Sequence, residues 1–327
     1  MNAQKWVTIW GSSPSISEPH PARYAKNITL RYVLRAMLDG EKIRLHLSNL
    51  GGQEDVVIPR VYVAPVTQGS DTDESRMLPV TFGGDFACKM AAGESVESDI
   101  VELPLKRGQD YAVSLYLGDM TLLASGTKDT GPLCRAFFAE GDFAACSQLD
   151  PFYTAPMNIF YFLTGVDALC REDCHALVCF GDSITAQSWP DYLMLRVLRD
   201  GPENLSVIRR GIGGSRVLRS YQHVLIRHYG QKGADRFERE VAVAGADRVI
   251  VLHGVNDLIH PDGSLFRPWS DLPTAQELID GLRYYVQRGH ELGLKVYLAT
   301  ILSIKGWHTY NACLLYTSPS PRDRSVS

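Results

Sequence analysis

The spacing of apolar residues changes once along this 327-residue chain, and this change constrains the fold more than any other feature. Up to about Phe143, apolar and polar residues alternate in short runs, which is typical of antiparallel strands with one buried face. Beyond Asp173, short and nearly continuous apolar runs alternate with stretches of helical spacing. That second pattern is typical of a parallel sheet covered by helices on both faces. The sequence therefore predicts a β-rich half followed by an α/β half.

Two alternating runs in the first half, at residues 30–34 and 43–47, flank the dipeptide Asp39-Gly40. Asp-Gly is a strong signal for a tight hairpin turn, so we expect these two runs to pair with each other. Further alternating runs between residues 56 and 117 supply enough strands for an antiparallel β-sandwich of the jelly-roll kind. The polar residues of this half show no motif spacing, so we expect the half to frame the structure or the substrate.

The second half contains four apolar runs that predict parallel strands, at residues 176–180, 205–208, 248–252 and 295–301. Helical spacing separates them, at residues 189–198, 217–244 and 274–292. Right-handed crossovers would place the C-terminal ends of all four strands at one edge of the sheet, where α/β proteins bind their ligands. We therefore predict four parts: a β-sandwich module at 1–150, a connector at 151–174, an α/β domain at 175–312 and a tail at 313–327.

Three of the predicted strands end in polar loops that contain glycine. These loops are Gly181-Asp182-Ser183, Gly211-Ile212-Gly213-Gly214-Ser215 and Gly254-Val255-Asn256-Asp257. Ser183 directly follows a buried strand and precedes a helix, so its hydroxyl should lie at the turn between them. Its backbone N–H would be among the free donors of a helix N-terminus, where negative charge is favoured. The sequence thus places a nucleophile and anion-binding groups at one edge of the sheet.

In these three loops the second half resembles the SGNH, or GDSL-type, acyl hydrolases. The resemblance implies a flavodoxin-like α/β/α domain with Ser183 as nucleophile. It also implies an oxyanion hole made by the backbone N–H groups of Ser183 and Gly214 and by the side chain of Asn256. Supporting positions would be Gly181, Asp182, Gly254 and Asp257. The first half, which opens with Trp6-Val-Thr-Ile-Trp-Gly-Ser-Ser, resembles the N-terminal module of two-domain bacterial GDSL esterases, whereas Arg209 stands where the family commonly has Asn.

The resemblance implies a serine esterase that hydrolyses short-chain or acetyl esters through an acyl-enzyme, with acetylated carbohydrate as the first candidate substrate. No metal or organic cofactor is implied, because a nucleophile, a base and oxyanion donors suffice for acyl transfer. The competing hypothesis is a non-catalytic carbohydrate-binding or scaffold protein.

The general base of the family comes from an Asp-x-x-His motif near the C-terminus, and this motif does not follow the fourth predicted strand. The histidine found there is His308, which has no Asp three residues before it. Composition changes abruptly at Cys313, and the run from Cys313 to Asp323 looks like a translated sequencing adapter. We therefore expect a gene fragment that ends near Ala312 and a chain that is inactive because it lacks the base. His253 or His260 could replace the base if their loop folded across Ser183.

Three other kinds of site can be considered from the sequence. His253, Asp257, His260 and Asp262 have ligand-like spacing and form an alternative metal site. A dinucleotide fingerprint beginning at Gly211 fails, because its third glycine would fall at Arg216. Cys170, Cys174 and His175 lack a second ligand pair for zinc.

Composition limits the partners and the location. The chain has 33 Lys and Arg against 37 Asp and Glu, a net charge of −4 and no basic tract, so we predict no nucleic-acid partner. No apolar run approaches the ~18 residues of a membrane span, and the N-terminus lacks the apolar core of a secretory signal, so we expect a cytoplasmic protein. Seven scattered cysteines are typical of reduced thiols. The oligomeric state stays open.

Overall fold

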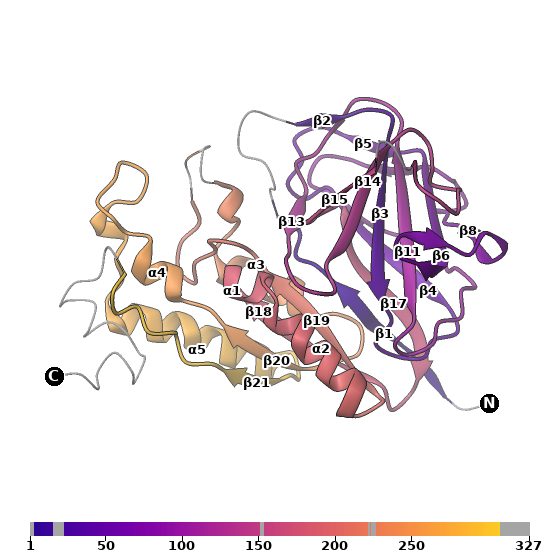
Figure 1. The fold of residues 1–327 in the computed structure, drawn as a ribbon. Coiled ribbons are helices and arrows are strands. Elements are labelled where there is room, and N and C mark those ends of the chain that lie inside the picture. Colours follow the sequence, from indigo (N-terminus) through magenta and orange to yellow (C-terminus); the bar gives the residue numbers. More distant parts are fainter. Residues whose placement is uncertain (1–2, 16–22, 151–153, 222, 224–226, 308–327) are drawn as a thin grey trace.

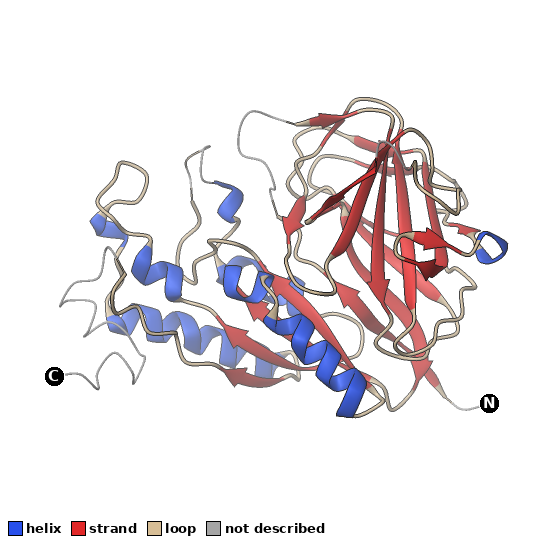
Figure 2. Cartoon of the chain, viewed as in Figure 1, coloured by secondary structure: helices blue, strands red, loops and turns tan. Residues whose placement is uncertain are grey.

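The computed structural model describes residues 3–15, 23–150, 154–221, 223 and 227–307. A β-rich half and an α/β half lie against each other (Figures 1 and 2). None of the described helices is both long enough and apolar enough to cross a membrane. The six described cysteines form no disulfide.

Two antiparallel sheets make up most of the β half. The first has the order β1 (Gln4–Gly11), β17 (Leu163–Arg171), β4 (Ile43–Ser48), β10 (Ser95–Glu97). The second has the order β15 (Thr154–Met157), β14 (Arg135–Glu140), β3 (Ile28–Arg35), β11 (Asp110–Leu117), β6 (Arg60–Gln68), β7 (Asp71–Thr72), and β8 (Leu78–Pro79) also pairs with β6. Apolar side chains of both sheets share one buried core. The antiparallel β architecture predicted from the alternating pattern is confirmed.

Short two-stranded ladders extend these sheets at their ends. They are β2 (Tyr24–Ala25) with β12 (Thr121–Leu122), β5 (Val56–Ile58) with β9 (Cys88–Met90), and β13 (Gly126–Lys128) with β16 (Ile159–Tyr161). A single 3₁₀ turn, η1 (Glu74–Arg76), follows β7. The ladder of β13 and β16 is the part of the β half that matters for the site below.

The hairpin expected around Asp39-Gly40 is wrong. β3 pairs with β11 and β14, whereas β4 pairs with β17 and β10, so the two runs belong to different sheets. The turn carries the chain across the sandwich, and Leu34 and Leu45 are both fully buried in the core between the sheets. Alternation shows which face of a strand is buried, but it does not show which strand is its neighbour.

The segment expected to be a connector contributes strands to the β half. β15, β16 and β17 all lie within residues 154–171, and β17 is a central strand of the first sheet, between β1 and β4. We therefore place the end of the β half at Arg171 rather than near residue 150.

The α/β half contains a parallel sheet in the order β19 (Leu205–Gly211), β18 (His175–Gly181), β20 (Ala246–Leu252), β21 (Lys295–Leu298). Numbered along the chain this order is 2-1-3-4, which confirms the flavodoxin-like prediction. β19 lies on one side of β18, and β20 and β21 lie on the other, so the order in which the chain adds strands to the sheet reverses at β18. Ligands of such sheets bind at this switch point, beyond the C-terminal ends of the strands.

The helices of this half are α1 (Ser183–Ala186), α2 (Trp189–Asp200), α3 (Gly233–Val241), α4 (Val255–Ile259) and α5 (Ala275–Glu291), with 3₁₀ turns η2 (Arg227–Tyr229) and η3 (Trp269–Asp271). Thr274 and Glu277 form a capping box that starts α5, close to the predicted start.

The long helix expected over 217–244 is wrong, because within the described residues of that range the α-helix covers only α3. The backbone N–H groups of Val217 and Leu218 bind the Asp257 carboxylate instead of continuing a helix. Gly230 has a φ of +75°, which also interrupts helical geometry.

Buried charged side chains of the α/β half bind groups of the β half. Arg210 donates to the carbonyl oxygens of Ser12 and Thr164, the latter at 2.7 Å. Arg236 pairs with Glu240 at 2.6 Å, and the same carboxylate accepts a hydrogen bond from Ser13 at 2.7 Å. Because these groups are almost completely buried, the contact between the halves is a fixed, hydrogen-bonded interface.

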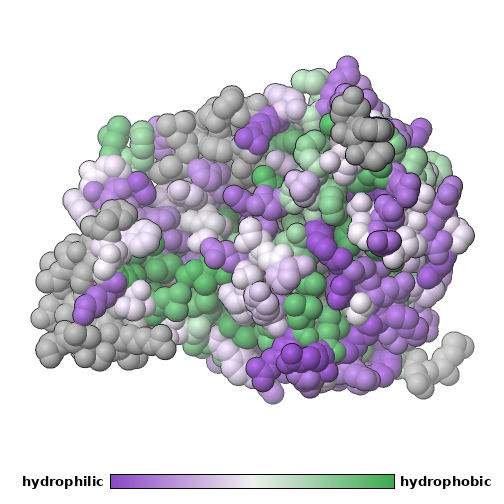
Figure 3. All heavy atoms as spheres, in the orientation of Figure 1, coloured by the Kyte–Doolittle hydropathy of each residue, from purple (hydrophilic) through white to green (hydrophobic). Residues whose placement is uncertain are grey.

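Apolar side chains gather on the visible face of the α/β half (Figure 3). Tyr297 and Leu298 of β21 and the following Leu302 and Trp307 are about half exposed. Among the described strands, β21 pairs with β20 alone, so its other edge has no described neighbour.

Candidate active site

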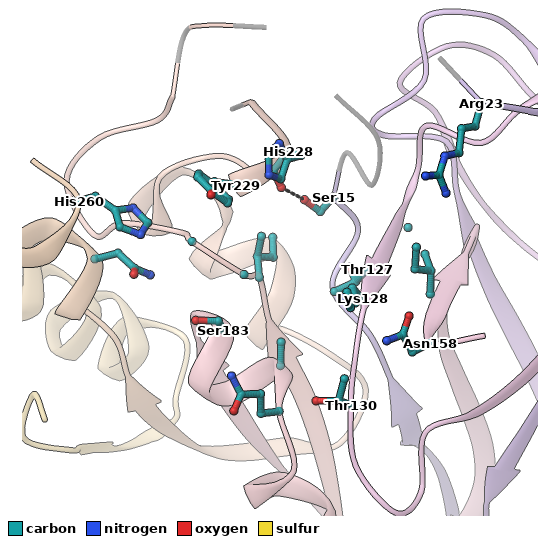
Figure 4. A pocket seen from close by; sticks show the side chains of 18 residues that line it. Ser15, Arg23, Thr127, Lys128, Thr130, Asn158, Ser183, His228, Tyr229 and His260 are labelled. Atoms are coloured by element: carbon teal, nitrogen blue, oxygen red, sulfur yellow. Dashed lines mark hydrogen bonds between the residues drawn. The ribbon is translucent and has the colours of Figure 1, made fainter. Parts of the chain in front are cut away.

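A cavity of about 750 Å³ lies where the two halves meet, at the C-terminal ends of β18, β19 and β20 (Figure 4). The three polar loops predicted from the sequence all reach it. Ser183, Gly213, Gly214 and Asn256 line the cavity together. The structure thus brings the expected nucleophile and the expected oxyanion donors to one place, at the switch point of the sheet.

Ser183 is the first residue of α1, and Asp182 caps this helix. The Asp182 carboxylate accepts a hydrogen bond from the backbone N–H of Ile184 at 3.0 Å. Gly181 is required at the turn, because a Cβ there would lie 2.2 Å from the carbonyl oxygen of Leu252. Among the described residues, the Ser183 hydroxyl makes no hydrogen bond with another side chain, so it faces the cavity unengaged.

The second loop passes directly over Ser183. A Cβ at Gly213 would lie 3.9 Å from the Cβ of Ser183, which shows how closely the loop approaches. Gly214 has a φ of +79°, and a Cβ there would clash with the ring of Tyr229 at 2.3 Å. Only glycine fits position 214, for both reasons.

The third loop starts α4 and positions Asn256. Gly254 caps this helix with a φ of +116°, which explains the glycine before Asn256. The Asn256 side chain is buried, and its Nδ2 donates to the carbonyl oxygen of Ser215 at 2.9 Å. One hydrogen of the amide is therefore used to fix the side chain, and the second is left for a ligand. Asp257 ties this loop to the second loop through the two backbone bonds described above.

His253 and His260 differ in their positions. His253 is buried outside the cavity lining, its Nδ1 lies 2.9 Å from the Tyr285 hydroxyl, and its Nε2 lies 3.0 Å from the Ser215 carbonyl oxygen. Burial lowers the pKa of His253 to about 3. Both ring nitrogens are engaged, so His253 is a structural residue rather than the base. His260 does line the cavity, its Nδ1 contacts the Tyr221 hydroxyl, and burial lowers its pKa to about 4.

The alternative metal site does not assemble. His253, Asp257, His260 and Asp262 bind other protein groups, and no three of them bring ligand atoms together within the described chain. The described residues that do so are His46, Glu97 and Asp167 in the β half. Arg44 pairs with both of these carboxylates, so an arginine already neutralises that cluster.

Arg209, which stands in place of the family's Asn, has a structural partner. Its guanidinium binds the buried Asp191 of α2 and lies 3.9 Å from Asp129 of the β half. The residue therefore joins the two halves and does not line the cavity. His308 and the tail at 313–327 lie outside the described residues, so the expectations about them are untested.

Several cavity residues had no signal in the sequence. His228 and Tyr229 belong to η2, inside the range predicted to be helical. Thr127, Lys128, Thr130 and Asn158 come from the ends of β13 and β16 in the β half. The pairing of these two distant strands brings them to the cavity, and local spacing does not encode such pairing.

The carboxyl group of Asp182 predicts a pH dependence of stability. Burial raises its pKa to about 7, so the folded protein holds a proton there that the unfolded chain releases near pH 4. Stability from this group is therefore present below pH 4 and lost as pH rises to 7, with a slope of at most about 1.4 kcal/mol per pH unit. Asp182→Asn keeps the oxygen that caps α1 and removes the titration. In urea unfolding at pH 5 and pH 8, the variant should gain stability relative to the wild type as pH rises.

Other titrating groups are common to both proteins and cancel in that difference. A difference in unfolding free energy that stays constant between pH 5 and pH 8 would show that the Asp182 carboxyl does not titrate in this range.

The family model described as GDSL-like Lipase/Acylhydrolase matches residues 179–324. A protein from Bacteroides fragilis described as an acylhydrolase aligns at 20% identity over 39% of this chain and 48% of its own, with a TM-score of 0.27. A Bacteroides ovatus protein described as a GDSL-like lipase aligns at 9% identity over 83% of this chain and 72% of its own, with a TM-score of 0.21. A clostridial cysteine protease aligns at 9% identity over 50% of this chain and 40% of its own, with a TM-score of 0.30.

The chain spans about half the length of the first of these proteins. No curated protein matches the sequence. The family match covers all three loops of the cavity and agrees with the sheet order. Residues 179–324, which make up most of the α/β half, therefore match the family of GDSL-like lipases and acylhydrolases.

Proposed function

We propose that this protein is a serine esterase that transfers an acyl group to Ser183 and then to water. The observation that supports this most is the meeting of three strand-end loops at one cavity, with Ser183, Gly214 and Asn256 on its wall. The Ser183 hydroxyl would attack the ester carbonyl, which gives a tetrahedral intermediate with a negative oxygen. Loss of the alcohol would leave the acyl-enzyme, and water would release the acid.

The negative oxygen needs donors that are already in place. The backbone N–H groups of Ser183 and Gly214 and the Nδ2 of Asn256 are assigned this role, and the hydrogen bond from Asn256 to Ser215 holds the amide in position. Gly181, Asp182, Gly254 and Asp257 support the loops that carry these donors. The chemistry requires no metal or organic cofactor.

The rate at which this chain hydrolyses an ester depends on a general base for Ser183. Among the described residues, no histidine nitrogen hydrogen-bonds the Ser183 hydroxyl, and His228 and His260 are the histidines on the cavity wall. We therefore propose that hydrolysis by this chain is slow without an added base. Oxyanion donors and binding alone supply an acceleration on the order of 10³–10⁴ over water.

For the substrate, we propose a short acyl ester such as an acetyl ester on a carbohydrate. The cavity volume of about 750 Å³ admits a ligand of one or two sugar rings, and Thr130, Asn158 and Gln187 on its wall can bind hydroxyl groups.

Asn256→Ala tests the oxyanion hole. Its amide would bind the oxyanion more strongly than the ground-state carbonyl, so kcat for p-nitrophenyl acetate should fall by ~10²–10³ while KM stays similar. Asn204→Ala is a matched control, because Asn204 hydrogen-bonds the Asp173 carbonyl oxygen outside the cavity. An Asn256→Ala variant that is folded and retains the kcat of the wild type would remove Asn256 from the mechanism.

A further inference from the structure

The β half supplies the wall of the cavity across from Ser183 (Figure 4). The backbone N–H of Thr130, just beyond β13, donates to the carbonyl oxygen of Ala186 at the end of α1, at 2.9 Å. This bond fixes the end of β13 relative to the helix that Ser183 begins. A helix rises about 1.5 Å and an extended chain about 3.3 Å per residue, and a backbone hydrogen bond separates Cα atoms by about 5.5 Å, so the Cα atoms of Lys128 and Ser183 lie within roughly 17 Å of each other.

Lys128 is the last residue of β13, and it is exposed and lines the cavity. Its neighbour Thr127 also lines the cavity, and its hydroxyl donates to the carbonyl oxygen of Ser13. Asp129, on the other side, is buried and accepts a hydrogen bond from Ser12 at 2.8 Å. The nearest carboxylate along the chain is therefore engaged in the interior and not with Lys128.

Within the described part of the chain, Lys128 has no carboxylate within ion-pair distance. Other lysines of the β half are paired, for example Lys42 with Glu102 at 2.7 Å and Lys106 with Asp39 at 3.2 Å. An ammonium group that no carboxylate neutralises attracts an anion that enters the cavity, with a strength that solvent and salt reduce because Lys128 is exposed.

Among the described residues of the cavity wall, the charged ones are the basic Lys128 and Arg23, and none is an Asp or Glu. The whole protein, in contrast, has a net charge of −4. In the view of Figure 4, Arg23 lies at the far end of the β-half wall. Thr130 and Asn158 add neutral polar groups close to Lys128. One ammonium flanked by neutral donors suits a singly charged carboxylate.

We propose that the site takes acyl esters whose alcohol portion carries a carboxylate, and that Lys128 binds this carboxylate while the ester lies at Ser183. The placement of the ester rests on the proposed function, whereas the recognition of the anion rests on the β-half wall alone. Lys128 is thus a specificity residue that the β half contributes to a site whose reacting groups come from the other half.

Binding of two amide analogues, which this chemistry does not cleave readily, tests the proposal without depending on turnover. 4-Acetamidobenzoate carries the carboxylate, and 4-acetamidobenzamide is its neutral counterpart. Calorimetry or NMR titration of the full chain should give a Kd about five- to tenfold lower for the carboxylate. Lys128→Gln should remove this preference and leave the Kd of the neutral analogue within twofold. Lys89→Gln, an exposed lysine that does not line the cavity, should retain it.

Raising NaCl from 0.05 to 0.5 M should also reduce the preference, because screening weakens an exposed charge pair. Equal Kd values for the two analogues, binding of neither, or a preference that survives Lys128→Gln would overturn the proposal. Failure of the proposed function is a separate result: a carboxylate preference that depends on Lys128, in a protein whose esterase activity does not depend on Ser183, would support the binding site and refute the serine esterase.

Discussion

Ser183→Ala is expected to abolish ester hydrolysis at this site, and the loss should be largest when imidazole is supplied as a general base. General bases contribute ~10²–10⁴ in rate when they act on a positioned nucleophile. The cavity is large enough for imidazole beside a small ester, and the Ser183 hydroxyl is unengaged. In imidazole buffer, hydrolysis of p-nitrophenyl acetate by the wild type should therefore exceed that by the variant by about 100-fold or more.

Imidazole also reacts with the ester directly, and the Ser183→Ala protein in the same buffer measures that background. Ser188→Ala controls for the loss of a nearby hydroxyl, because Ser188 precedes α2 and makes no capping hydrogen bond through its side chain. Equal rates for the wild type and Ser183→Ala would favour a non-catalytic binding protein. Fast hydrolysis without imidazole that Ser183→Ala removes would show that the chain contains its own base, and His228→Ala and His260→Ala would then identify a described one.

Arg236→Met is expected to destabilise the protein by about 3–5 kcal/mol, the usual loss when one partner of a buried ion pair is removed. Arg236 is fully buried, and it binds Glu240 at 2.6 Å, the carbonyl oxygen of Gly181 at 2.6 Å and the Ser215 hydroxyl at 3.2 Å. Methionine fills a similar volume but leaves the Glu240 carboxylate buried without this partner. Urea unfolding at pH 7 measures the loss.

Two further variants separate the charge from the packing. Arg283→Met breaks an exposed pair with Asp280 in α5 and should change the unfolding free energy by no more than about 0.5 kcal/mol. Arg236→Met combined with Glu240→Leu removes both buried charges and should recover much of the loss, because apolar replacement of a whole buried pair is often neutral. A double variant that is as unstable as the single one would assign the effect to the hydrogen bonds on Gly181 and Ser215.

The strands of the α/β half could be predicted because they are buried on both faces. A strand such as β20 leaves a nearly continuous apolar run that needs no partner information to recognise. Strand pairing in the β half could not be predicted in the same way. The apolar alternation of β3 and β4 fits a hairpin and a crossing between sheets equally well, since both arrangements bury the same faces. The helix expected over 217–244 failed because Asp257, a residue distant in sequence, takes the backbone donors of Val217 and Leu218.

The residues of the candidate site also fall into those that local sequence motifs predict and those that only distant contacts bring to the cavity. Ser183, Gly214 and Asn256 lie directly at strand ends, so motifs identified them and the topology brought them together. Lys128 and His228 reach the cavity through contacts between distant segments, which leave no local pattern. The distinction between His253 and His260 also needed coordinates, because only six residues, most of them in α4, separate a buried structural ring from one on the cavity wall.

The order of synthesis affects the acceptor groups that the buried arginines bind in the folded protein. The β half leaves the ribosome first, with the Asp129 carboxylate and the carbonyl oxygens of Ser12 and Thr164 destined for its inner surface. Their partners, Arg209 and Arg210, are synthesised some 40 to 200 residues later. Within the β half, Ser12 already donates to the Asp129 carboxylate and to the Thr164 carbonyl oxygen. Until Arg210 arrives, water must satisfy the carbonyl oxygen of Ser12 itself, since leaving it dry would cost about 1–3 kcal/mol. The nascent β half is therefore expected to stay hydrated along this surface, and to reach its final packing only when β19 docks against it.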